Sequence, residues 1–411
     1  MRQSAEGHRK RDVDLGSLFA AAFTLIGAGI GASRVSDNSF LTHLATGRRM
    51  VDEGFVRSDA FTWTSAGEPV VVQSWLASGI YGVVDATAGL GGLRLLMAAT
   101  VAALAFLAWQ LSERSTSVAV RVCSVGVVVW IGTVTWTQRP LLLGLIALAL
   151  TLVWVERARD PRGLFLVGVL WIGVHGSWPL GLVLLTVRAF GAAADSYEAD
   201  RELRAALAAS KTRAEVKAGL WLGGGMVFGG LINPYGPRLL IFPLKLLSRG
   251  EVLAYISEWK ASGFDSLWSQ LFLVLIALAL VAARRAPMVT IAPAVVFVVA
   301  ALLSARNISV ASLVLLPLLA AGLPQLAARS VSYRSSAVTL AVRGLAVLVV
   351  LVPLVAVRGP HVDLERYPEA AIDAMETELG LDPRTARVVH PDFVGNYLAC
   401  LLYTSPSPRD A

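Results

Sequence analysis

Two polar runs, residues 37–49 (DNSFLTHLATGRR) and residues 59–76 (DAFTWTSAGEPVVVQSWL), stand out from an otherwise apolar chain. Both follow soon after the first apolar segment, and the stretch that contains them is rich in acids, arginines and aromatic residues. A membrane protein that acts on a polar substrate needs such a region at the water interface. The sequence therefore predicts that the apolar segments hold this region, residues 34–74, as a large first loop outside the bilayer.

The composition is that of a membrane protein. Of the 411 residues, 55% are hydrophobic and only 16% are charged, whereas a soluble domain carries about 25% charged residues. The net charge of +7 is interpreted as a topology signal, because many Arg and Lys residues cluster in short loops between apolar segments. We expect a lipid bilayer and no nucleic acid as partner. The two cysteines, Cys123 and Cys400, predict neither a disulfide framework nor a metal site.

Apolar runs of about 20 residues, the length that a bilayer core requires, predict about eleven transmembrane helices. Residues 75–88 are apolar but contain Gly79, Gly82 and Asp85, so we expect a helix that lies on the outer face or re-enters. The fold class is thus an all-α polytopic membrane protein. The spans are expected at residues 15–32, 90–111, 117–136, 140–156, 162–175, 179–194, 219–233, 266–283, 288–304, 308–327 and 338–357.

Basic residues set the predicted orientation. Four Arg and Lys residues precede the first span, which predicts a cytoplasmic N-terminus, and alternation then places the arginine-dense connections inside. Residues 195–218 fit a cytoplasmic amphipathic helix or a solvated connector, and the connector is favoured. Arg94, Arg188 and Arg343 lie towards span ends, where they can snorkel. The prediction is a multi-pass protein of the plasma (inner) membrane with an extracytoplasmic active site.

Alternation also places six polar pieces on the outer side, and we expect them to form one binding site. The catalytic candidates are Asp37, Asp59 and His43, with Asp37 favoured over Asp59 as general base because a helix end fixes its backbone. Arginines suit phosphate recognition, although each also suits an interfacial anchor to lipid headgroups. The candidates for substrate binding are Arg48, Arg139, His175, Asn233, Tyr235, Glu258, Trp259 and Arg306.

The chain changes character after residue 357. Residues 368–379 predict a short helix, residues 385–389 a short strand, and residues 395–399 the start of another element. We therefore expect residues 358–399 to begin a small extracytoplasmic α/β domain after the membrane domain, residues 1–357. Residues 400–411 resemble the translated read-through of a sequencing adapter, and we expect this tail to be non-native.

The ordered set of motifs resembles a family of bacterial multispanning proteins related to the GT-C superfamily of glycosyltransferases. The later motifs Arg139-Pro140, His175-Gly176, Asn233 to Gly236, Glu258-Trp259 and Arg306 are similar to its landmarks. Val56-Arg57 and Gln73-Ser74 depart from its pattern, which commonly has a proline and an acidic residue there. The first outer loop resembles the family's Asp-x5-His-x3-Gly, Asp-x-Phe-Ser/Thr-x-Thr, Gly-x-Pro and Trp-Leu at Asp37, His43, Gly47, Asp59, Phe61, Thr62, Thr64, Gly67, Pro69, Trp75 and Leu76.

This resemblance implies an inverting glycosyltransferase that uses a polyprenyl-phosphate-linked sugar and an envelope acceptor: a glycan, a lipid or a protein. It implies an acid of the first outer loop as the base. It leaves the cofactor open, because some relatives use a divalent metal and others do not. Two alternatives remain, a transporter or flippase of lipid-linked glycans and a non-catalytic envelope-assembly protein. The transporter is less favoured, because the spans hold few ionisable residues.

Overall fold

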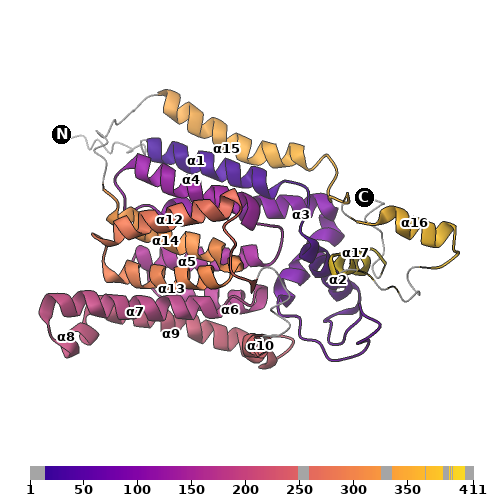
Figure 1. The fold of residues 1–411 in the computed structure, drawn as a ribbon, viewed down its shortest axis with the longest axis horizontal. Helices are drawn as coiled ribbons and strands as arrows, with labels where there is room; N and C mark the ends of the chain where they lie inside the picture. The colour runs from indigo at the N-terminus through magenta and orange to yellow at the C-terminus, as the bar shows by residue number, and fades with distance from the viewer. Residues whose placement is uncertain are drawn as a thin grey trace, which may run out of the picture.

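The computed structural model describes residues 14–248, 259–324, 336–365, 367–382, 388, 390 and 392–402. These residues form helices and two isolated β-bridges, and no strand occurs among them. Most helices run alongside one another in an elongated bundle, with α2, α16 and α17 at one end (Figure 1). The bundle helices are α1 (Leu15–Gly31), α3 (Trp75–Leu111), α4 (Val118–Thr135), α5 (Leu141–Glu156), α6 (Gly163–Val174), α7 (Pro179–Asp200), α9 (Ser210–Leu231), α12 (Leu267–Ala283), α13 (Met288–Leu303), α14 (Ile308–Gly322) and α15 (Ser336–Ala356).

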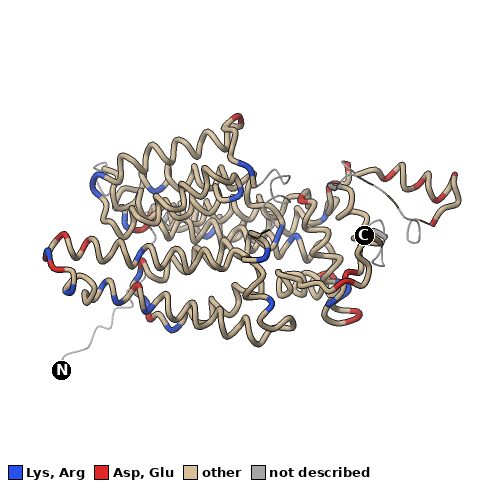
Figure 2. The backbone as a smooth tube through the Cα atoms, turned by 60° about the horizontal axis from the view of Figure 1, so that its bottom comes forward, with Lys and Arg blue, Asp and Glu red and all other residues tan. Residues whose placement is uncertain are grey.

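The fold confirms an all-α protein with helices suited to a membrane. Five helical segments are long and apolar enough to cross a bilayer, namely α3, α4, α7, α15 and Ala305–Gly322, which contains α14. Five more apolar helices have 10–17 residues, which is shorter than the roughly 20 that a span needs. Each of the eleven predicted ranges contains a helix, but eleven spans are not confirmed. Acidic and basic residues mark the bundle ends more than its middle (Figure 2).

The short elements lie between and after the bundle helices. The helix α3 is broken at Gly89, whose φ of 61° and ψ of −166° fall in a region that glycine adopts readily. The first part of α3 thus corresponds to the separate segment predicted over residues 75–88. The remaining elements are α2 (Asn38–Glu53), α8 (Leu203–Ala208), α10 (Arg238–Leu247), the 3₁₀-helix η2 (Ala305–Asn307), α16 (Glu369–Thr377) and α17 (Asp392–Leu402).

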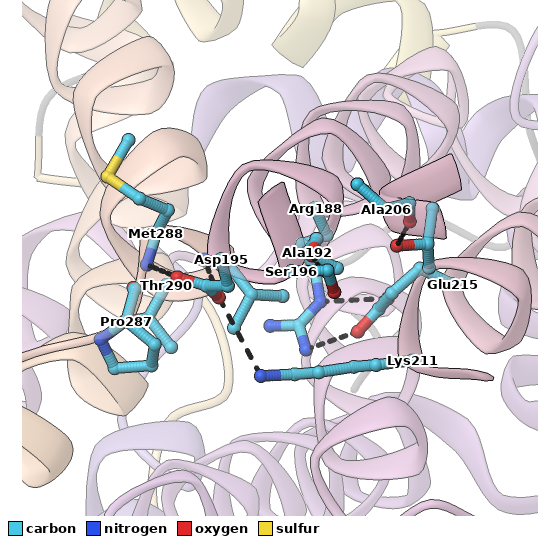
Figure 3. A network of polar contacts seen from close by, with 12 residues as sticks. Arg188, Ala192, Asp195, Ser196, Ala206, Lys211, Glu215, Pro287, Met288 and Thr290 are labelled. Carbon is cyan, nitrogen blue, oxygen red and sulfur yellow. Dashed lines mark hydrogen bonds and ion pairs between the residues drawn. The ribbon is translucent and has the colours of Figure 1, made fainter. Parts of the chain in front are cut away.

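Arg188 does not snorkel. Its side chain is 2% exposed and forms ion pairs of 2.7 Å with Glu215 of α9 and with Glu156 of α5. Figure 3 shows the guanidinium facing Glu215. Arg114 pairs with the other oxygen of Glu156 at 2.6 Å, so the cluster balances two positive and two negative charges. Buried charges are tolerated when they are paired in this way.

Residues 195–218 are mostly helical, although most of them are exposed. The helix α7 continues to Asp200, and α9 begins at Ser210. Asp195 accepts hydrogen bonds from the backbone N–H groups of Met288 and Val289, at 2.6 and 3.1 Å, and so caps the N-terminus of α13 (Figure 3). These contacts tie together the end of the bundle that is predicted to lie inside.

Arg94 also does not snorkel, because it is 3% exposed and its guanidinium donates hydrogen bonds to three backbone carbonyls. It donates to Ala32 at the end of α1 and to Gly359 and Pro360 after α15. The backbone after Pro360 then pairs with Val35. The N–H of Val35 donates to the carbonyl of His361, and the N–H of Asp363 donates to the carbonyl of Val35, both at 2.9 Å. The segment after α15 is thereby fastened to the first polar loop.

The described part of the C-terminal piece contains two helices. The helix α16 lies within the predicted residues 368–379, and α17 covers the element predicted at residues 395–399. The strand predicted at residues 385–389 lies outside the described residues, apart from residue 388. An α/β domain is therefore not confirmed. Residues 403–411 of the tail also lie outside the described residues.

Candidate functional site

One cavity of about 890 Å³ lies at the end of the bundle that carries α2. Its walls come from the first polar loop and from residues between bundle helices far apart in the sequence. It contains six of the candidate residues. They are His43, Asp59, Arg139, His175, Trp259 and Arg306.

The helix α2 supplies a polar stripe to this cavity. Asp37 caps the helix, because its Oδ1 accepts hydrogen bonds from the N–H and hydroxyl of Ser39, at 2.9 and 2.7 Å. Residues at intervals of three and four share one face of a helix. The stripe that faces the cavity follows this spacing: Ser39, Thr42, His43 and Thr46. Three of these four were missed in the sequence analysis, although the spacing alone could have revealed them.

Close backbone packing places His43. A Cβ atom on Gly47 of α2 would overlap the carbonyl of Ser78, and one on Gly82 of α3 would overlap the backbone of Gly47. Only glycine permits this approach. It brings His43 Nδ1 to 3.0 Å from the Ser78 hydroxyl. Burial lowers the pKa of His43 to about 4, with nearby Asp37 opposing and Arg139 reinforcing the shift, so His43 is neutral at neutral pH.

Asp37 binds Arg139 instead of lining the cavity. Arg139 donates from Nε to Asp37 Oδ2 at 2.8 Å and to the Thr137 hydroxyl at 2.8 Å. Burial acts to raise the pKa of Asp37, but Arg139 and hydrogen bonds from Thr137 and Ser39 outweigh burial and leave the pKa below its usual value. A carboxylate held in this way is a weak proton acceptor. Arg139 itself reaches the cavity.

Asp59 lines the cavity from a hairpin-like turn. The N–H of Asp59 donates to the carbonyl of Glu68, and the N–H of Gly67 donates to the carbonyl of Asp59, at 2.8 and 3.0 Å. The carboxylate accepts from the N–H groups of Phe61 and Thr62 and from the Thr62 hydroxyl. These bonds fix its position without a cation, in contrast to the ion pair at Asp37.

Arg306 and Trp259 form a second wall. The guanidinium carbon of Arg306 lies 4.4 Å from the centre of the Trp259 ring, within the range of a cation–π contact. The N–H of Ala305 donates to the carbonyl of Lys260 at 2.9 Å, which joins the two segments. This contact holds the guanidinium against the ring at the cavity wall, and a guanidinium suits the recognition of phosphate.

His175 stands between these walls at the end of α6. The backbone N–H of Ser177 donates to His175 Nδ1 at 3.1 Å. Burial, followed by the positive charge of Arg306, lowers the pKa of His175 to about 3. The ring is therefore neutral at neutral pH, and its proton lies on Nε2, because Nδ1 acts as acceptor.

The C-terminal segment closes the cavity on a further side, although none of its residues is among the candidates chosen from the sequence. His390, Gly395, Asn396 and Ala399 line it. The Thr42 hydroxyl of α2 donates to Asn396 Oδ1. Tyr367 stacks on Tyr397 with ring centres 4.5 Å apart. Since Thr42 and Asn396 lie 354 positions apart, no local sequence signal could indicate this contact.

Besides Asp37, three described candidates lie outside the cavity lining. Arg48 pairs with Asp85 of α3 at 2.7 Å and is absent from the cavity lining. The Asn233 side chain organises its own turn, with Oδ1 accepting from the N–H of Tyr235. The Tyr235 hydroxyl donates to the carbonyl of Val56 at 2.8 Å, and so ties this turn to the first polar loop. Glu258 lies outside the described residues.

No protein-family model matches this chain, and no curated protein sequence matches it. Its assignment therefore depends on the site itself.

The described part of the chain contains no cluster of side chains suited to bind a divalent metal ion. No group of three or more His, Cys, Asp or Glu residues there is close enough to hold a metal ion. Asp59 is the one carboxylate among the described residues that line the cavity, whereas a divalent ion with oxygen ligands usually needs more. We therefore derive no step through a metal.

Proposed function

We propose that this protein is an integral membrane glycosyltransferase of the extracytoplasmic side of the plasma membrane. It would transfer a sugar from a polyprenyl-phosphate donor to an envelope acceptor with inversion. The observation that carries the proposal is the cavity at one end of an apolar bundle, whose lining includes Arg139, Arg306, Asp59 and two neutral histidines. The sequence resemblance to GT-C enzymes points to the same reaction.

Two arginines account for the donor phosphate. Polyprenyl phosphate leaves as an anion and needs no proton, but its negative charge needs cations. Arg139 and Arg306 come from the starts of α5 and α14 and line the same cavity. Apolar side chains of the same lining, such as Leu180, Leu246 and Val310, suit the first units of the lipid chain.

Asp59 is the better-placed general base. In a single displacement, the acceptor hydroxyl attacks the anomeric carbon, its proton passes to the base, and the bond from carbon to the phosphate oxygen breaks with its electron pair. Asp59 lines the cavity, whereas Asp37 is occupied by Arg139. We therefore assign the proton to Asp59 and assign to Asp37 the positioning of Arg139. This reverses the order of the two acids favoured by the sequence.

Binding of a polyprenyl phosphate to the purified protein in lipid nanodiscs tests the donor site. Arg306→Ala and Arg139→Ala should each weaken binding about 10-fold or more, because a hydrogen bond to a charged group contributes about 1.5–3 kcal/mol. Arg49→Ala is the matched control, because Arg49 pairs with Glu53 and does not line the cavity. Thermal unfolding of Arg139→Ala must be checked, since Asp37 loses its cation. Unchanged affinity in both variants would remove phosphate binding from the proposal.

Transfer from a panel of polyprenyl-phosphate sugars separates the enzyme from the two alternatives. Binding without transfer would favour the non-catalytic protein, and movement of the lipid between leaflets would favour the flippase. The buried cluster around Arg188 does not strengthen the flippase, because its charges are paired and absent from the cavity lining.

A further inference from the structure

The helix α10 (Arg238–Leu247) has two different sides. Pro243 and Leu246 line the cavity, and Leu239 is 1% exposed. The opposite side is open: Ile241 is 47% and Leu244 69% exposed. A ten-residue helix thus separates the cavity from the surroundings of the protein.

The open side of α10 carries cations next to its apolar residues. Arg238 and Lys245 are exposed and have no ion-pair partner among the described residues. At 100° per residue, Arg238 and Lys245 fall about 20° apart around the helix, and Leu244 falls about 100–120° from them. The exposed arc therefore has one basic edge and one apolar edge. This is the pattern of a helix that lies in a membrane interface.

The position of α10 fits such a role. A Cβ atom on Gly230, in the last turn of α9, would contact Leu240, so α10 packs against the end of α9. The exposed apolar side chains of α9 include Val227, Phe228 and Leu231 at 48–55%, and exposed apolar residues resume on α10. Figure 1 shows α10 foreshortened beside the end of the bundle, not continuing the line of α9.

We propose that α10 lies in the headgroup layer of the outer leaflet and binds anionic phospholipid. Ile241 and Leu244 enter the boundary of the acyl chains, while Arg238 and Lys245 contact lipid phosphates. The wall of the cavity formed by Pro243 and Leu246 is then held at headgroup depth. The proposal does not depend on the reaction that the cavity performs.

Depth-dependent quenching by brominated phospholipids tests the position of α10. The full chain, with Cys123→Ser and Cys400→Ser, receives a single cysteine labelled with an environment-sensitive fluorophore. Leu244→Cys should be quenched by bromines near the headgroups. Ser65→Cys, on the exposed turn of the first loop, is the water control, and Leu220→Cys, 70% exposed on α9, is the acyl-chain control. If residue 244 is quenched no more than residue 65, the proposal is overturned. That result would mean that water or another protein, and not lipid, covers residue 244.

The basic edge is tested separately with bound lipids counted by native mass spectrometry. Arg238→Gln with Lys245→Gln should lower the preference for anionic over zwitterionic phospholipid several-fold. Arg238→Lys with Lys245→Arg keeps both charges and should keep that preference. An unchanged preference in the glutamine variant, with both proteins equally folded, would contradict headgroup binding by α10.

Discussion

At the scale of single residues, Asp37 and Asp59 differ in what their carboxylates already bind. Asp37 holds Arg139, whereas the partners of the Asp59 carboxylate among the described residues are donors of its own turn. We expect Asp59→Asn to reduce kcat by on the order of 10²-fold, the usual effect of losing a general base. Asp37→Asn should instead raise KM for the donor, because Arg139 loses its anchor. Steady-state kinetics of both variants measures this difference. The reverse pattern would restore Asp37 as the base.

The two cavity histidines predict a pH dependence of stability. Their folded-state pKa values of about 4 and about 3 lie below the unfolded value of 6.5. The unfolded chain therefore binds protons first, and stability falls as pH decreases below about 6.5. The melting temperature of the purified protein should drop between pH 7 and pH 5. His43→Gln with His175→Gln should flatten that slope, and an unchanged slope would exclude these two groups as its cause.

Which residues pair could not be predicted from the sequence. Asp37 lies 102 positions from Arg139, and Arg48 lies 37 positions from Asp85. The residue types indicated phosphate recognition and acid–base chemistry, but only the packing of α2 on α3 decides which arginine reaches the cavity. Arg48 is a candidate for substrate binding because it lies in the first polar run, but its ion pair with Asp85 of α3 keeps its side chain out of the cavity lining.

At the scale of elements, the contact between α2 and α3 depends on two glycines. Gly82→Ala should destabilise the protein by about 1–3 kcal/mol, because the new methyl group would overlap the backbone of Gly47. Gly79→Ala is the matched control on the same helix, where nothing lies within 4 Å of a new Cβ. It should be neutral or stabilising by up to about 1 kcal/mol. Thermal unfolding compares the two, and equal losses would contradict close packing as the cause.

Helices were easier to predict than their roles. Long apolar runs with flanking Gly, Pro and Arg residues predicted most bundle helices within a few residues. The sequence favoured a plain connector over residues 195–218, but this range is mostly helical. Its charged residues suggested a surface segment, whereas Glu215 is buried through its ion pair with Arg188, which also pairs with Glu156. The burial of a charged residue in an ion pair cannot be predicted from the hydrophobic pattern of the sequence.

At the scale of the whole molecule, alternation of the bundle helices separates two polar ends. The cavity lies at one end, and the Arg188 cluster and α8 lie towards the other. We expect a membrane-impermeant maleimide to label Ser65→Cys in intact cells and to leave Arg204→Cys unlabelled until the cells are opened. Cys123→Ser removes the exposed native thiol. Labelling of both positions from outside would contradict an extracytoplasmic cavity.

The wall that α17 gives to the cavity has a consequence for biosynthesis. Chains emerge from the ribosome N-terminus first, so every bundle helix is made before residues 390–399 exist. Until then, the cavity lacks the side that contains Asn396. The bundle helices and the last side of the cavity are therefore synthesised at different times, and the cavity cannot be complete until Asn396 has been made.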